Sequence, residues 1–346
     1  MYDNYKVVVN TAAGRRRCMQ YLVPFVISSD IVDRYDIWIN THNGADIEFF
    51  RKLSKAYSKI NLVWQPDGIV DGISSINAFY KKCIEEQTVY CKLDDDIIWM
   101  EEDSIEKMVK FRIDNPEYFV VSPLIINNSL STYLLQERGK IKLDKYYNPM
   151  CAHPILWKNG EFAVQLHQWF LNTQLTTGKY RDLHISKQPM GMTRFSINCI
   201  LWFGDVMKEF NGIVPGDDEE FVSCIYPTRH GMMNCWNGDV VMAHFAFYTQ
   251  REKLDKANIL QQYGDYLAEI WSNDSNMRMI HQNVQSIMEH IAEKEKELRS
   301  IPSPYREKMK KKKGVLKRIY DKSPFLIKYI VRTVYLKLQP KPVYIK

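Results

Sequence analysis

Short apolar runs alternate with segments of helical periodicity along the first part of the chain. The apolar runs contain many β-branched residues and predict buried strands at 5–10, 35–40, 60–64 and 89–93. Apolar side chains three or four residues apart predict helices between them, at 18–27, 47–57 and 75–86. This alternation predicts an α/β fold, in which a mostly parallel sheet carries helices on both faces.

The pattern continues more irregularly towards the C-terminus. A helix is predicted at 104–114, and further strands at 118–126, 195–202 and 240–243. Periodicity is poor between 128 and 190, and the stretch 251–298 is helical and charged. We therefore expect an α/β domain over 1–250 with halves at 1–126 and 127–250, then a helical extension over 251–300 and a tail over 301–346.

Three consecutive carboxylates, Asp94, Asp95 and Asp96, directly follow the fourth predicted strand. The chain turns apolar again at Ile97, so these like charges lie beside a core and need water or a cation. Oxygen ligands suit Mg²⁺ or Mn²⁺, and open α/β sheets bind ligands at the carboxyl ends of their strands. The alternative is an acidic surface turn, which is a common feature.

The loops after the predicted strands should open onto one crevice, because parallel strands end at the same edge of the sheet. These loops are 11–17, 40–46, 65–72 and 94–96. The first, TAAGRRR, contains Thr11 and Arg15 and can bring backbone and guanidinium groups to a phosphate or a base. The third is a Pro, Gly and Asp turn that contains Asp67.

Two further polar elements occur late in the chain. A second acidic cluster, Asp217 to Glu220, precedes an apolar helix, where acidic residues are also ordinary helix caps. His244 directly follows the strand at 240–243, a position in which a histidine is often purely structural. Together with an aspartate from 94–96, it is a chemically sensible ligand for Mn²⁺.

In these motifs the chain resembles GT-A-type glycosyltransferases of the bacterial capsule and surface-polysaccharide type. The likeness covers about residues 5–250 and depends on the hydrophobic strand followed by Asp-x-Asp, on TAAGRRR, on the INT loop, and on AHFAFY. The second acidic motif matches with Asp at 217 where the family commonly has Glu, which leaves the register open between Asp217 and Asp218.

The resemblance implies a role for each motif. The half 1–126 would bind the nucleotide sugar and 127–250 the acceptor, where Trp157, His167, Trp169 and Tyr180 either line a site or simply cover the sheet. A UDP-sugar is the expected donor and a glycan or lipid-linked hydroxyl the expected acceptor, and inversion is the expected stereochemical outcome at the sugar. The implied residues are Asp96 and His244 for Mn²⁺ or Mg²⁺, Thr11, Arg15, Asp67, Asp94 and Asp95 for the nucleotide sugar, and Asp218 or Asp217 as general base.

Charge is distributed unevenly along the chain. Residues 301–346 hold fourteen Lys or Arg and two Asp or Glu, a net charge of +12, which leaves −6 for the body of a chain whose total is +6. An acidic body argues against nucleic-acid binding. The stretch 310–338 combines a Lys block with an amphipathic pattern, which predicts contact with an anionic membrane surface, or docking on the body or a partner.

The remaining features indicate a compartment. The seven cysteines are odd in number and form no Cys-x-x-Cys pair, which favours reduced thiols over a disulfide framework or zinc site. The N-terminus does not resemble a signal peptide, and no uncharged apolar run approaches the ~20 residues of a membrane span. We therefore expect a cytoplasmic protein, peripheral on the inner face of the membrane.

Three other functions are compatible with parts of this pattern. A nucleotidyltransferase acting on a sugar phosphate shares the sheet and the aspartates, although TAAGRRR matches its Gly-rich basic loop only in part. A non-catalytic membrane-surface adaptor would keep the body as a degenerate enzyme fold. A metal-dependent phosphohydrolase fits less well, because the His-Asp spacings of two-metal sites are absent from the sequence.

Overall fold

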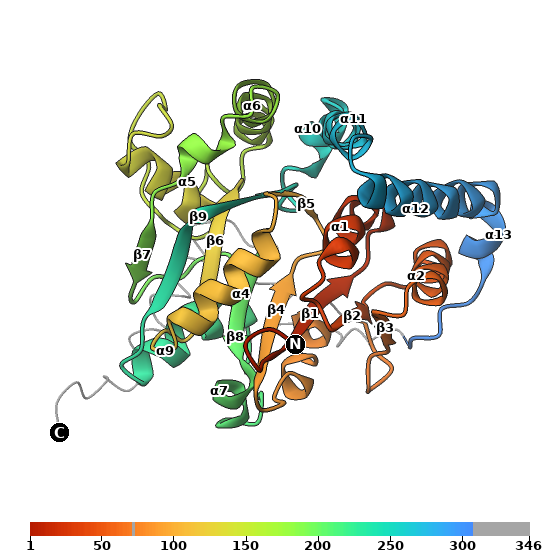
Figure 1. Ribbon diagram of the computed structural model, residues 1–346, viewed down its shortest axis with the longest axis horizontal. Coiled ribbons are helices and arrows are strands. Elements are labelled where there is room, and N and C mark those ends of the chain that lie inside the picture. Colours follow the sequence, from red (N-terminus) through yellow and green to blue (C-terminus); the bar gives the residue numbers. More distant parts are fainter. Residues whose placement is uncertain (71–72, 307–346) are drawn as a thin grey trace, which may run out of the picture. The chain divides into compact units, whose positions relative to one another are not determined.

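The predicted alternation of strands and helices is confirmed. The computed structural model describes residues 1–70 and 73–306, and Figure 1 shows how their elements are arranged. Within this part the sheet has the order β3-β2-β1-β4-β8-β6-β9-β5, with β7 paired to β9. The strands are β1 Lys6–Ala13, β2 Arg34–Ile39, β3 Ile60–Val63, β4 Thr88–Leu93, β5 Ile97–Met100, β6 Val121–Ile126, β7 Lys187–Met190, β8 Cys199–Phe203 and β9 Asn234–His244.

Six of the nine strands in the described part of the chain run in the same direction. β1 pairs in parallel with β2 and β4, β2 with β3, and β6 with β9. β8 runs antiparallel to β4 and β6, while β5 and β7 run antiparallel to β9. The sheet is therefore mostly parallel, and β1, β4 and β9 all end at the same edge.

The helices account for most of the remaining described residues. The longer ones are α1 Arg16–Ser28, α2 Gly44–Ala56, α4 Ser104–Asp114, α5 Ser129–Glu137, α6 Gly160–Trp169, α11 Ile259–Trp271 and α12 Ser275–Glu293. The shorter ones are α3 Ile73–Asn77, α7 Gly204–Lys208, α8 Asp218–Glu220, α9 Tyr226–Arg229, α10 Arg251–Lys256 and α13 Glu295–Ser300. Single irregular helical turns lie at Tyr80–Lys82, Phe170–Leu175, Tyr180–Leu183 and Phe221–Ile225.

Strand side chains alternate between two apolar cores, one on each face of the sheet. Val7 and Val9 of β1 enter one core, and Val8 enters the other. The first core is closed by apolar residues of α1, α2, α4 and α12, and the second mainly by those of α5, α6 and α11. Both faces of the sheet are therefore covered by helices, which confirms the predicted fold class.

The sequence pattern missed or misplaced several elements. The strands β5 and β7 were not predicted, because each is four residues long and, among the described strands, pairs only with the distant β9. The helix predicted over 75–86 is instead the short α3 followed by one turn. The side-chain amide of Asn77 donates hydrogen bonds to the carbonyl oxygens of Val214 and Gly216, so tertiary contacts replace helix continuation there.

Residues Met1–Arg306 form one compact unit. The predicted helical stretch after residue 250 is confirmed as α10 to α13, and α12 buries Ile280, Val284 and Ile287 in the same core as α1 and α2. The basic stretch 310–338 lies outside the described residues. Among the described residues, no helix has both the length and the apolar character needed to cross a bilayer.

Candidate functional site

A tight turn between β4 and β5 carries the three aspartates at the carboxyl edge of the sheet. The turn is fixed on both sides by backbone hydrogen bonds. The amide of Asp94 donates to the carbonyl of Asn198 at 2.8 Å, and the amide of Phe245 donates to the carbonyl of Asp96 at 2.8 Å. Because Ile97 also pairs with His244, the reversal from β4 into β5 brings the aspartates to the end of β9.

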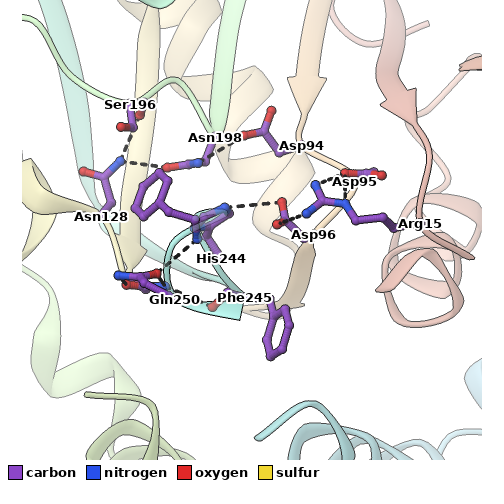
Figure 2. Close-up of polar contacts among 12 residues, drawn as sticks. Arg15, Asp94, Asp95, Asp96, Asn128, Ser196, Asn198, His244, Phe245 and Gln250 are labelled. Atoms are coloured by element: carbon purple, nitrogen blue, oxygen red, sulfur yellow. Dashed lines mark hydrogen bonds and ion pairs between the residues drawn. The ribbon is translucent and has the colours of Figure 1, made fainter. Parts of the chain in front are cut away.

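Asp96 is buried between a histidine and an arginine, as Figure 2 shows. Its Oδ1 lies 3.3 Å from His244 Nε2, and its Oδ2 accepts a hydrogen bond from Arg15 Nη1 at 2.6 Å. Burial alone would raise the pKa of this carboxyl. The charge of Arg15 and the contact with His244 outweigh burial and hold the pKa well below its usual range, so Asp96 is ionised at neutral pH.

Asp94 is held by two donors, Lys92 of β4 and Asn198, which directly precedes β8. Its Oδ1 accepts from Lys92 Nζ at 2.5 Å and its Oδ2 from Asn198 Nδ2 at 3.0 Å. Lys92 is buried and also donates to the carbonyl of Ile197 at 2.6 Å. Burial opposes the charge on Lys92, but Asp94 and Asp218 raise its pKa, so the ammonium persists. Sequence reasoning missed Lys92, although a lysine inside an otherwise apolar strand is a signal for it.

The donor atoms of Asp94, Asp96 and His244 all lie within 4.8 Å of one another, so these three residues fit a divalent cation. The buried Nδ1 of His244 has no hydrogen-bond partner among the described residues, so one ring nitrogen makes no hydrogen bond to them. The sequence predicted Asp96 and His244 as ligands and placed Asp94 with the donor. The structure brings Asp94 into the same group.

Asp95 faces away from this group and joins two loops. Its Oδ2 accepts from the amide of Gly14 at 2.8 Å, and its Oδ1 accepts from Arg15 Nε at 2.9 Å and from Arg15 Nη2. Arg15 is thus fixed between Asp95 and Asp96. Both carboxylate oxygens of Asp95 are engaged, so the residue connects the β1–α1 loop to the aspartate turn.

Two other predicted nucleotide-sugar residues do not join the cluster. Thr11 lies within β1, and its fully buried hydroxyl is 3.0 Å from the hydroxyl of Tyr35. Asp67 is exposed in the turn after β3, where it accepts from the amide of Ile69 at 3.0 Å and its carbonyl accepts from Arg306. Neither residue therefore belongs to the group of side chains at the aspartate turn.

Asp217 and Asp218, the two candidates for the general base in the second acidic cluster, have different surroundings. Asp217 is the N-cap of α8, accepting from the amide of Glu220 at 3.3 Å, and it also accepts from Arg194 at 2.9 Å. Asp218 is partly buried and accepts from the hydroxyl of Tyr80 at 3.2 Å. Burial raises the pKa of Asp218, and the nearby charges of Asp94 and Asp217 add to this, although Lys92 and Tyr80 oppose it.

A buried polar network holds the segment that follows His244. The carbonyl of Phe245 accepts from Asn127 at 3.0 Å and lies 2.9 Å from His167 Nε2, and the other ring nitrogen of His167 is 2.9 Å from the hydroxyl of Tyr263. Gln250 exchanges hydrogen bonds with the side chain of Asn127. His167, considered as a residue of an acceptor site, is therefore part of the internal support for the loop that carries His244.

The burial of His167 predicts a stability change with pH. Burial lowers its pKa to about 4, whereas the unfolded chain binds this proton near pH 6.5. The stabilisation is therefore complete above about pH 6.5 and is lost as the pH falls towards 4, by up to about 3 kcal/mol. Urea unfolding of wild type and His167→Gln at pH 7, 5.5 and 4.5 measures it. We expect the free energy of unfolding to fall less between pH 7 and 4.5 in His167→Gln than in wild type. An equal fall in the two proteins would contradict a lowered pKa for His167.

No protein-family model matches this chain, and no curated protein matches it. Solved structures with a similar trace include a CMP:2-keto-3-deoxy-manno-octonic acid synthetase complexed with CTP, at 9% identity and a TM-score of 0.40, covering 75% of this chain and 98% of that one. Another is a 4-diphosphocytidyl-2C-methyl-D-erythritol synthase from Anaerococcus prevotii, at 11% identity and a TM-score of 0.39. The match covers 75% of this chain and 100% of that one. At these values the likeness assigns neither a family nor an activity.

Proposed function

We propose that this protein is a metal-dependent glycosyltransferase, which moves a sugar from a nucleoside-diphosphate sugar to a hydroxyl of a glycan or lipid-linked acceptor. The observation that carries the proposal is the grouping of Asp94, Asp96 and His244 within 4.8 Å at the ligand-binding edge of the sheet. A separate carboxylate, Asp218, interacts electrostatically with Asp94 and Lys92 of the same edge. The sequence resemblance described above supports the same activity.

The metal-binding group accounts for the departure of the nucleotide. Asp94, Asp96 and His244 would hold Mn²⁺ or Mg²⁺, which when bound supplies Lewis-acid stabilisation of the charge on the departing diphosphate. Lys92 and Asn198 orient Asp94, while Arg15 orients Asp96. Each carboxylate is therefore fixed in direction before any ligand arrives, which lowers the reorganisation needed during the reaction.

Asp218 is the proposed general base. Its raised pKa and its position outside the metal-binding group suit it to accept the proton of the acceptor hydroxyl as that oxygen attacks the anomeric carbon. The bond from the anomeric carbon to the diphosphate oxygen breaks as the new glycosidic bond forms. A single base opposite the leaving group gives inversion of configuration. Asp217 is engaged with Arg194 and with the backbone of α8, so it is less available for this task.

The finer features of the proposal come from the sequence. A UDP-sugar donor follows from the resemblance alone. Association with the inner face of an anionic membrane follows from the charge of the tail at 310–338, which would bring the active site close to a lipid-linked acceptor.

The reaction products test the proposal. The purified full chain is incubated with Mn²⁺ or chelator, a panel of sugar nucleotides, and glycan or lipid-linked acceptors, and the products are identified by mass. Metal-dependent release of a nucleoside diphosphate together with a lengthened acceptor supports glycosyl transfer. Release of pyrophosphate from a nucleoside triphosphate and a sugar phosphate would instead assign a nucleotidyltransferase. No turnover and a flat metal titration would favour the non-catalytic adaptor.

A further inference from the structure

Arg251 begins helix α10, directly after the loop that supports His244. The preceding residue, Gln250, is fully buried and exchanges hydrogen bonds with Asn127 at 2.9 and 3.2 Å. Gln250 also accepts from the amide of Phe247 at 3.0 Å. The start of α10 is therefore fixed relative to the aspartate turn, to which Phe245 is already hydrogen-bonded.

The guanidinium of Arg251 has no hydrogen-bond or ion-pair partner among the residues that the structure describes. Its Nε is buried and makes no hydrogen bond, and no ion pair within residues 1–70 and 73–306 includes this side chain. The other arginines near the site are all paired with carboxylates: Arg15 with Asp95 and Asp96, Arg16 with Asp46 and Glu295, and Arg17 with Asp255. A partly buried cation without a partner is costly, so its retention here needs an explanation.

The surroundings of Arg251 point to an anion from outside the chain. Asp95 and Asp96 attract its charge, whereas Arg15 repels it. Those two carboxylates already accept hydrogen bonds from Arg15, and Asp96 also contacts His244. The guanidinium thus remains available to a ligand bound beside the metal-binding group, and its planar fork of donors matches phosphate oxygens.

We propose that Arg251 binds the diphosphate of the sugar-nucleotide donor and of the nucleoside-diphosphate product. This inference rests on the proposed function and adds the group that recognises the second phosphate. The ligand would supply oxygens to the terminal nitrogens of this half-buried guanidinium, and Arg251 would share the diphosphate charge with a cation held by Asp94, Asp96 and His244. Arg251 should therefore discriminate a nucleoside diphosphate from the corresponding monophosphate.

Calorimetric titration of the full chain with UDP and with UMP, both in the presence of Mn²⁺, tests this discrimination. For Arg251→Gln we expect the affinity for UDP to fall about 10- to 100-fold, the loss expected for a charge-assisted hydrogen bond, while the affinity for UMP changes less than about threefold. Arg251→Lys keeps the positive charge but loses the planar fork of donors, so its affinity for UDP should lie between those of wild type and Arg251→Gln. Lys256→Gln is the matched control, because Lys256 lies on the same helix and its ion pair in the described part of the chain is with the exposed Glu252.

The possible outcomes separate the inference from the proposed function. Equal UDP affinity in wild type and Arg251→Gln overturns the role of Arg251 and leaves the proposed function intact. Equal losses for UDP and UMP, with no recovery in Arg251→Lys, also overturn it, because they indicate a general structural role. If wild type binds no member of a panel of nucleoside diphosphates with Mn²⁺, both the proposed function and this inference fail.

Discussion

Replacing Asp96 with asparagine should abolish metal-dependent binding of nucleoside diphosphates, with a loss of affinity of about 100-fold or more. Asp96 is the buried carboxylate between His244 and Arg15, and its pKa is held low enough to keep it charged. Asparagine keeps the shape but removes the negative charge that a hard divalent cation requires. Calorimetric titration with a panel of nucleoside diphosphates, in Mn²⁺ and in chelator, measures the effect.

Asp114→Asn provides the matched control for this substitution. Asp114 is an exposed residue at the end of α4 that pairs with Lys110 one helical turn away, so the same chemical change there should leave nucleotide binding unaltered. Circular dichroism and urea unfolding of both variants would show whether Asp96→Asn remains folded. A folded Asp96→Asn protein that retains full metal-dependent binding would refute the metal assignment.

Replacing Asp218 with asparagine should separate donor binding from transfer. Asp218 lies outside the metal-binding group, so the affinity for the nucleoside diphosphate should stay within about twofold of wild type. Transfer should fall by about 10²- to 10⁴-fold, the usual contribution of a general base. In wild type, transfer should also decline as the pH falls through the raised pKa of Asp218, because the base acts only when ionised. Initial rates of product formation across a pH series measure both effects.

Asp217→Asn resolves the one-residue ambiguity in this motif. Asparagine is as good an N-cap as aspartate, so the start of α8 should persist, and only the charge facing Arg194 is lost. We expect transfer within a few fold of wild type. If Asp217→Asn loses transfer and Asp218→Asn keeps it, the base is Asp217 and the register is shifted by one residue.

The sequence pattern indicated Asp96 and His244 as members of the proposed metal-binding group because they lie at or just beyond strand ends. Asp94 to Asp96 and His244 each follow a clear apolar run, and a parallel sheet brings such positions to one edge. What it could not give was the direction of each side chain. Adjacent residues in a tight turn point in different directions, so both oxygens of Asp95 are bonded to Gly14 and Arg15, whereas Asp94 and Asp96 each place a carboxylate oxygen near His244. That difference depends on the pairing of β5 with β9, for which the sequence holds no local signal.

Residues that depend on distant partners were the hardest to predict. Thr11 was placed in a loop, yet β1 continues to Ala13 because it pairs with β2 as far as Ile39. Lys92 and Arg251 were not singled out, since their importance comes from buried contacts and missing partners that only the three-dimensional arrangement reveals. Helix α4, by contrast, has its predicted bounds, because a complete amphipathic pattern lies within a single segment.

The position of β9 also determines when the candidate site can be assembled during synthesis. Among the described strands, β5 pairs only with β9, and β4 pairs with β8. The aspartate turn between β4 and β5 therefore depends on residues more than 100 positions later in the chain. A nascent chain that has emerged only as far as β6 holds Asp94 and Asp96 without Asn198 or His244. The proposed cation site therefore cannot be complete before β9 has been synthesised.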